Sequence, residues 1–209
     1  MENKMFCFQC EQTAGCSGCT GNAGVCGKTA ETANLQDELT GALIGLARAC
    51  ENNPYDASVT DIIAEGLFAT ITNVNLNDEI IREMTEKVRK KKYEVVPNCR
   101  VCTAKCGNTD DYDVTRIRNE ADDIRSLKSL ILCCIKGMAA DLYHANLLGY
   151  RDNTVNDFFI KALCILSYDL NKEELLKVVT EAEEVKHKCM ELRSKSNTEN
   201  DEYKRQIYG

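Results

Sequence analysis

The chain has 209 residues, 13 of them cysteine, and a formal net charge of −7 at pH 7. This acidic balance argues against non-specific nucleic-acid binding, and the one basic run, KVRKKK at residues 87–92, is typical of the solvated C-terminal end of a helix. The sequence shows no secretory signal and no apolar run long enough to span a membrane. So many cysteines in such a chain favour reduced thiols in the cytoplasm over a secreted disulfide scaffold.

The first predicted segment, residues 1–31, is rich in cysteine and glycine. It contains the stretch CFQCEQTAGCSGCTGNAGVC. Cys7 and Cys10 have the spacing by which a single tight turn presents two thiolates to one metal centre. Cys19 and Cys26 are the best candidates for two further ligands, which leaves Cys16 as a bystander or an alternative third ligand. The spacing fits an iron–sulfur cluster and also a zinc site with four thiolates.

Residues 32–94 predict a first bundle of three helices. Apolar residues recur at steps of three and four, which is typical of helices with one buried face. The expected helices cover about 32–52, 58–72 and 78–94. Ser58 and Asp78 are the expected N-terminal caps of the second and third helices.

Residues 95–114 break this pattern and predict a loop between two subdomains. The loop contains Cys99, Cys102 and Cys106. Three thiols within eight residues are compatible with a second metal site, for which the sequence names no fourth ligand. The alternative is three free surface thiols, which a reducing cell tolerates, and we favour this empty state.

Residues 115–193 predict a second three-helix bundle, with helices at about 115–148, 153–167 and 171–192, and residues 194–209 predict a mobile polar tail. Gly149 stands where a helix C-cap is expected. Neither His144 nor His187 has a second histidine one helical turn away, so both are expected to have no catalytic role. The predicted fold is all-α: two three-helix bundles with an N-terminal cysteine-rich iron–sulfur loop.

Four segments of the chain resemble one known family. They are CFQCEQTA at the start, CGKTAETANLQD at residues 26–37, LFATITNVN at 67–75 and DDIRSLKSLILCCIKGMAADLYHANLLG at 122–149. Together they resemble the hybrid cluster proteins, also called prismane proteins or hydroxylamine reductases. The resemblance covers essentially the whole chain but only the first of the family's three domains. It implies that Cys7, Cys10, Cys19 and Cys26 hold a 4Fe-4S cubane, and it offers no ligand assignment for the later cysteines.

The resemblance implies an electron-entry domain, in which the cubane passes electrons between an external redox partner and a catalytic cluster. In the family, reduction of hydroxylamine or nitric oxide is attributed to a hybrid cluster held by the second and third domains. Three functions therefore compete. The chain is an electron-transfer protein or subunit; or it is part of a hydroxylamine or nitric oxide reductase, active with a partner chain that supplies the missing domains or through an additional cluster; or it is a zinc-stabilised helical interaction module. Whether the chain is itself an enzyme stays open.

Overall fold

The computed structural model describes residues 5–8, 18–51, 53–71, 76–96 and 110–208, with side chains described up to residue 197. Among these residues the structure contains helices but no strand or sheet, apart from two isolated bridges, which confirms the all-α prediction. The helices are α1 (Ala30–Cys50), α2 (Ala57–Ala69), α3 (Asp78–Val95), α4 (Thr115–Arg118), α5 (Asp122–Leu147), α6 (Asn153–Leu166) and α7 (Lys172–Tyr208).

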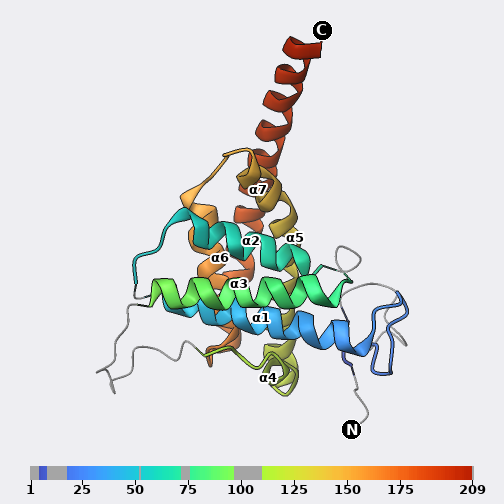
Figure 1. Cartoon of the computed structure of the whole chain (residues 1–209). Helices are drawn as coiled ribbons and strands as arrows, with labels where there is room; N and C mark the ends of the chain where they lie inside the picture. The colour runs from blue at the N-terminus through green and yellow to red at the C-terminus, as the bar shows by residue number, and fades with distance from the viewer. Residues whose placement is uncertain (1–4, 9–17, 52, 72–75, 97–109, 209) are drawn as a thin grey trace.

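The helices form two layers that cross (Figure 1). In the first layer α1 and α3 lie side by side, and α2 lies beside α3. In the second layer α5, α6 and α7 run steeply across the first. The layers meet where α2 packs on α5 and α1 packs on α6. The N-terminal segment lies at the start of α1, where the chain enters the first layer.

One continuous hydrophobic core joins the two predicted bundles. It includes Leu39 and Leu43 of α1, Ile63 of α2, Ile131 of α5 and Phe158 of α6, all almost completely buried. Burying one such side chain stabilises a fold by about 1.5–3 kcal/mol. The two groups of helices thus share one core across the layer boundary.

Five of the described helices begin with a side-chain cap, and at the start of α7 the Asn171 side chain accepts a 3.0 Å hydrogen bond from the Glu174 amide. The side chains of Thr29, Asp56, Asn77 and Asp152 accept backbone N–H bonds at the starts of α1, α2, α3 and α6. The predicted caps were therefore wrong: the cap of α2 is Asp56, two residues before Ser58, and the cap of α3 is Asn77, one residue before Asp78. The Ser58 amide instead donates to Asp56 at 2.9 Å.

Asp78 has a different role at the start of α3. Its carboxylate accepts a 2.6 Å hydrogen bond from the Thr32 hydroxyl in the first turn of α1. Arg82 and Glu31 form an exposed ion pair at the same ends of these two helices. These contacts join the start of α1, which follows the cysteine-rich segment, to α3.

Two helix boundaries differ from the prediction. The expected helix at 115–148 is divided, because Asn119 ends α4 by a turn and Ala121 has extended backbone angles before α5 begins. Gly149 follows α5 with φ of +83°, which confirms its place as the C-terminal stop. The last helix does not end near residue 192 as expected but continues to Tyr208. Residues 193–208 contain neither glycine nor proline, so nothing in the sequence interrupts the helix.

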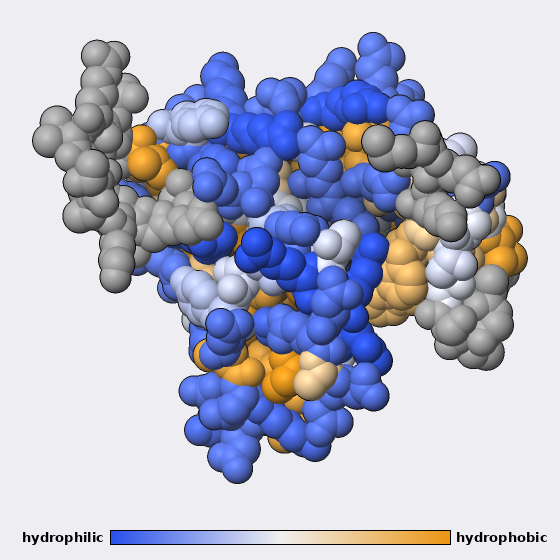
Figure 2. All heavy atoms as spheres, turned by 90° about the horizontal axis from the view of Figure 1, so that it is seen from below, coloured by the Kyte–Doolittle hydropathy of each residue, from blue (hydrophilic) through white to orange (hydrophobic). Residues whose placement is uncertain are grey.

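The surface seen in Figure 2 is mainly hydrophilic, with hydrophobic side chains in separate patches. The most exposed large apolar residues, Val25, Tyr93, Leu147 and Met190, come from four different elements. Within the part of the chain that the structure describes, no helix is long and apolar enough to cross a membrane.

Candidate metal centre

Two of the predicted ligands face each other across a short antiparallel pair. The Cys7 amide donates to the Cys19 carbonyl at 3.0 Å, and the Cys19 amide donates to the Cys7 carbonyl at 2.8 Å. Residues directly opposite in an antiparallel pair have their side chains on the same face. The two thiols, 12 positions apart in sequence, therefore lie on one side of this pair.

A glycine allows the two segments to approach. Gly18 has φ of +150°, which residues with side chains rarely adopt. A Cβ at this position would lie 2.8 Å from the Phe6 ring. The guanidinium carbon of Arg118 lies 4.6 Å from the centre of the same ring, on the side of α4. The Phe6 ring thus contacts both Gly18 and a cationic side chain of α4.

Cys26 is on the next turn of the chain. In that turn the Gly24 amide donates to the Lys28 carbonyl at 2.7 Å, and Gly27 has φ of +85°. The Cys26 sulfur and the Met5 methyl carbon both lie 3.6 Å from the position of a Cβ on Gly24. Met5 is also buried against Cys19 in a small cluster of its own. The turn that carries Cys26 therefore borders the small hydrophobic cluster that contains Met5 and Cys19.

A buried lysine contacts the first cysteine. Lys28 is only 1% exposed. Its Nζ lies 3.8 Å from the Cys7 sulfur and donates a 2.5 Å hydrogen bond to Oε1 of Gln36, which lies eight residues further along the chain in α1. The ammonium group is thus held against the cysteine by the first helix.

Further charges are buried around this lysine. Burial raises the pKa of Asp37, although Arg118, with which it forms an ion pair, and the nearby Lys136 and Lys28 act to lower it. Burial lowers the pKa of Lys136 to about 8, against the opposing effect of Asp37. Lys28 and Cys7 also act on Lys136 electrostatically. The cysteine pair therefore lies beside three cations and one carboxylate, of which Lys28 and Lys136 are buried and Arg118 and Asp37 are partly buried.

The thiols and the nearby cations are suited to a soft metal centre. The described cysteines are all free thiols, and thiolates select zinc or iron–sulfur clusters. A centre with four thiolate ligands is rich in negative charge, which the buried ammonium of Lys28 would offset. Cys10 and Cys16 lie outside the described residues. Among the residues that are described, no three cysteine, histidine, aspartate or glutamate side chains are close enough together to hold a metal ion.

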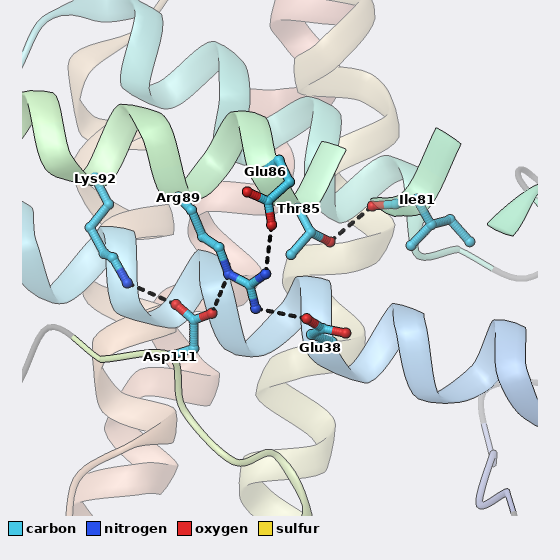
Figure 3. Close-up of polar contacts among 7 residues, drawn as sticks. All are labelled: Glu38, Ile81, Thr85, Glu86, Arg89, Lys92 and Asp111. Atoms are coloured by element: carbon cyan, nitrogen blue, oxygen red, sulfur yellow. Dashed lines mark hydrogen bonds and ion pairs between the residues drawn. The ribbon is translucent and has the colours of Figure 1, made fainter. Parts of the chain in front are cut away.

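The second predicted cysteine group, Cys99, Cys102 and Cys106, lies outside the described residues. The structure does show how the chain returns to the helices after it (Figure 3). Asp111 accepts a 2.8 Å hydrogen bond from Lys92 and a 2.7 Å hydrogen bond from Arg89, both on α3. Arg89 also contacts Glu38 of α1 and Glu86 of α3. These ion pairs fix residue 111 to α3 and, through Arg89, connect it to α1.

Sequence reasoning missed the basic residues of the site. In the sequence, Lys28 stood out only as part of the segment CGKTAETANLQD. Its contact with Cys7 joins residues 21 positions apart, which no sequence pattern predicts. Lys136 could have been noticed, because it lies next to Ile135 and close to Ala139 on the buried side of α5. A lysine on an otherwise apolar helix face is a sign of a buried charge.

The two histidines were expected to have no catalytic role. The His144 ring packs against the rings of Phe68 and Tyr143, with centroids 5.5 Å apart in each case. His187 lies on α7.

Comparison with known proteins identifies the family. Residues 5–202 match the Prismane/CO dehydrogenase family. The chain belongs to this family. Proteins named hydroxylamine reductase are similar to this prismane-family chain: 38% identical in Methanococcus vannielii, 38% in Porphyromonas gingivalis and 36% in Methanocaldococcus jannaschii. These matches cover 93–95% of the chain but 39–40% of the relatives. The prismane-family chain thus spans about two fifths of the length of the relatives it matches.

Proposed function

We propose that this chain binds one 4Fe-4S cluster through Cys7, Cys10, Cys19 and Cys26 and transfers electrons. In this role it is the electron-entry domain of a system of the hydroxylamine reductase kind. It accepts electrons from a redox partner protein and passes them to a catalytic centre outside the residues that match. The free thiols of the described chain favour a reducing, cytoplasmic setting for this work.

The observation that carries the proposal is the Cys7–Cys19 pair with Lys28 behind it. The pair presents two soft ligands from two backbone segments that are hydrogen-bonded to each other, and the turn before α1 brings Cys26 beside the small hydrophobic cluster of Met5 and Cys19. When bound, the cluster supplies a one-electron redox centre. The residues of this chain hold it and shield it: Met5 and Cys19 are buried, and Lys28 places a positive charge beside one ligand.

The named relatives support a role in hydroxylamine reduction, but the chain spans about two fifths of their length. We therefore assign electron entry to the chain alone and reduction to its combination with a partner chain. We expect the isolated 209-residue chain to show no hydroxylamine turnover with a reduced viologen as donor. Turnover that is proportional to protein and lost with the cluster would contradict this assignment.

Metal analysis of anaerobically purified protein tests the cluster. We expect about four iron atoms and four acid-labile sulfides per chain, and a broad visible absorbance that dithionite bleaches. Alanine at Cys7, Cys10, Cys19 or Cys26 should abolish both, whereas Cys16→Ala, the matched control in the same segment, should keep them. Loss in Cys16→Ala with retention in Cys19→Ala would disprove the ligand set. Zinc without bleachable absorbance would show a structural zinc site instead.

A further inference from the structure

The position of Lys28 is fixed by contacts from two sides. Its side chain is buried, its Nζ donates to Gln36 at 2.5 Å, and the Cys7 sulfur lies 3.8 Å away. A lysine that buries only its aliphatic chain usually extends its ammonium group into water. Here the group is directed inward, toward a sulfur atom.

This arrangement is costly unless the sulfur carries negative charge. A buried ammonium needs a charged partner to offset its lost hydration, and Gln36 is a neutral amide. The carboxylate of Asp37 is near enough to interact with Lys28, but it is paired with Arg118. Among the described contacts of Lys28, a thiolate or a metal-bound sulfur at Cys7 would supply the negative charge that Gln36 does not. The environment of Lys28 therefore suits a ligated Cys7 better than a neutral thiol.

We propose that Lys28 stabilises negative charge on the metal centre bound through Cys7 and so raises its affinity for an electron. This inference rests on the proposed function, since it concerns the cluster assigned to Cys7. Adding an electron makes such a centre more negative, so a fixed cation beside a ligand favours the reduced form. We expect the interaction to be strong because the Lys28 side chain is buried, where water screens charges poorly. Lys28 is a positioning and tuning residue, and the cysteines bind the centre.

Two substitutions separate the charge of Lys28 from its shape. Lys28→Met keeps a long flexible side chain without the charge, and Lys28→Arg keeps the charge. The matched control is Lys128→Met on α5, because Lys128 is also 1% exposed and its Nζ pairs with Glu120 at 2.5 Å. Loss of Lys128 removes an equally buried lysine that pairs with a carboxylate instead of a cysteine.

The measurement is a redox titration of each anaerobically purified protein, followed by visible absorbance and normalised to iron and sulfide content. We expect Lys28→Met to shift the midpoint to a more negative potential. A roughly tenfold weakening of the one-electron equilibrium would correspond to about 59 mV. Lys28→Arg should stay close to wild type, and Lys128→Met should leave the midpoint unchanged. A fully loaded Lys28→Met protein with the wild-type midpoint would overturn the inference.

If the Lys28→Met protein does not retain the cluster, its redox midpoint cannot be measured, and the iron content of the variants then tests the inference. Loss of iron from Lys28→Met and Lys28→Gln, with normal helicity and with iron retained in Lys28→Arg, supports the need for a positive charge. Loss from Lys28→Arg as well would show that packing, and not charge, is the role of Lys28. A wild-type protein without iron and sulfide would remove the proposed function, and the inference with it. A loaded wild type with an unshifted variant removes the inference alone.

Discussion

The backbone amide of Tyr112 donates a 3.0 Å hydrogen bond to the carbonyl oxygen of Gly41, in the middle of α1. A Cβ on residue 41 would lie 2.2 Å from the Tyr112 carbonyl oxygen. Only a glycine therefore allows the chain to pass this closely over α1. The contact fixes the chain next to Asp111, directly after the stretch that contains Cys99, Cys102 and Cys106.

We predict that Gly41→Ala destabilises the protein by roughly 1–3 kcal/mol or more, because the obstacle is backbone and cannot rotate away. Gly137→Ala is the matched control, since Gly137 is also within a helix but has nothing within 4 Å of its Cβ position. That change should stabilise by about 0.5–1 kcal/mol. Urea unfolding followed by helicity measures both. Equal stability of Gly41→Ala and wild type would show that residue 112 is not held against α1.

Asp111 gives a second prediction. Burial would raise the pKa of this carboxyl, but hydrogen bonds from Lys92 and Arg89 outweigh that effect and hold the pKa below its ordinary value. A carboxyl with a lowered pKa in the folded state stabilises the protein above its unfolded pKa near 4, and this stabilisation is lost as pH falls through the folded value. Asp111→Asn should therefore cost roughly 1–3 kcal/mol at pH 7, because Lys92 stays buried without its anionic partner.

Urea unfolding at several pH values tests this. The difference between Asp111→Asn and wild type should shrink as the pH falls below 4, where the carboxyl becomes neutral. Asp122→Asn serves as the control, because Asp122 forms only an exposed pair with Arg125 of its own helix. A difference that does not depend on pH would assign the loss to packing instead of charge.

The helices could be predicted from sequence because each needs only local information. The three- and four-residue spacing of Leu35, Leu39, Leu43 and Leu46 is sufficient to place α1. Caps are harder, because neighbouring Asn77 and Asp78 are both good capping residues. In the structure Asn77 is the cap, and Asp78 instead accepts a hydrogen bond from Thr32, which is 46 positions away.

The candidate site could be predicted only for its sulfur atoms. Spacing indicates cysteine ligands, because the ligands of one centre are often close in sequence. It does not indicate Lys28 beside Cys7, or Arg118 on the Phe6 ring, since these contacts form only when α1 and α4 pack around the N-terminal segment. The close approach of Tyr112 to Gly41 likewise depends on tertiary structure.

Lys136 gives a third prediction, on pH. Burial lowers its pKa from an ordinary value of 10.5 to about 8. Between these values the unfolded chain holds a proton that the folded chain has lost, so stability should rise with pH across this window. The expected rise is up to roughly 3 kcal/mol. Below pH 8 the lysine is charged in both states and contributes no slope.

Lys136→Met should remove this rise, whereas the exposed Lys172→Met should not. The free energy of unfolding, measured for the three proteins at intervals between pH 7 and 10.5, gives the comparison. A direct check is the pH titration of the lysine side-chain signals by NMR, in which Lys136 should titrate near pH 8. Parallel stability curves for Lys136→Met and wild type would contradict the assignment of the slope to this residue.

The last prediction uses the remaining cysteines. Burial raises the pKa of Cys50 and of Cys189 to about 12, and it raises the pKa of Cys164 above its ordinary value. A thiol must ionise to react with an alkylating agent, so these three should stay unmodified at pH 8 in the native protein. They should react completely once the chain is unfolded in urea.

The same experiment tests the second cysteine group. Three thiolates are one ligand short of a usual four-coordinate site, so we expect Cys99, Cys102 and Cys106 to hold no metal. Iodoacetamide added to native, anaerobically prepared protein should then modify all three, while the buried thiols give the internal reference for protection by the fold. Mass spectrometry of the peptides identifies each modified residue. Protection of all three until a chelator removes metal would instead show a second centre, and iron above four per chain would confirm it, because bound thiolates cannot react while they are ligands.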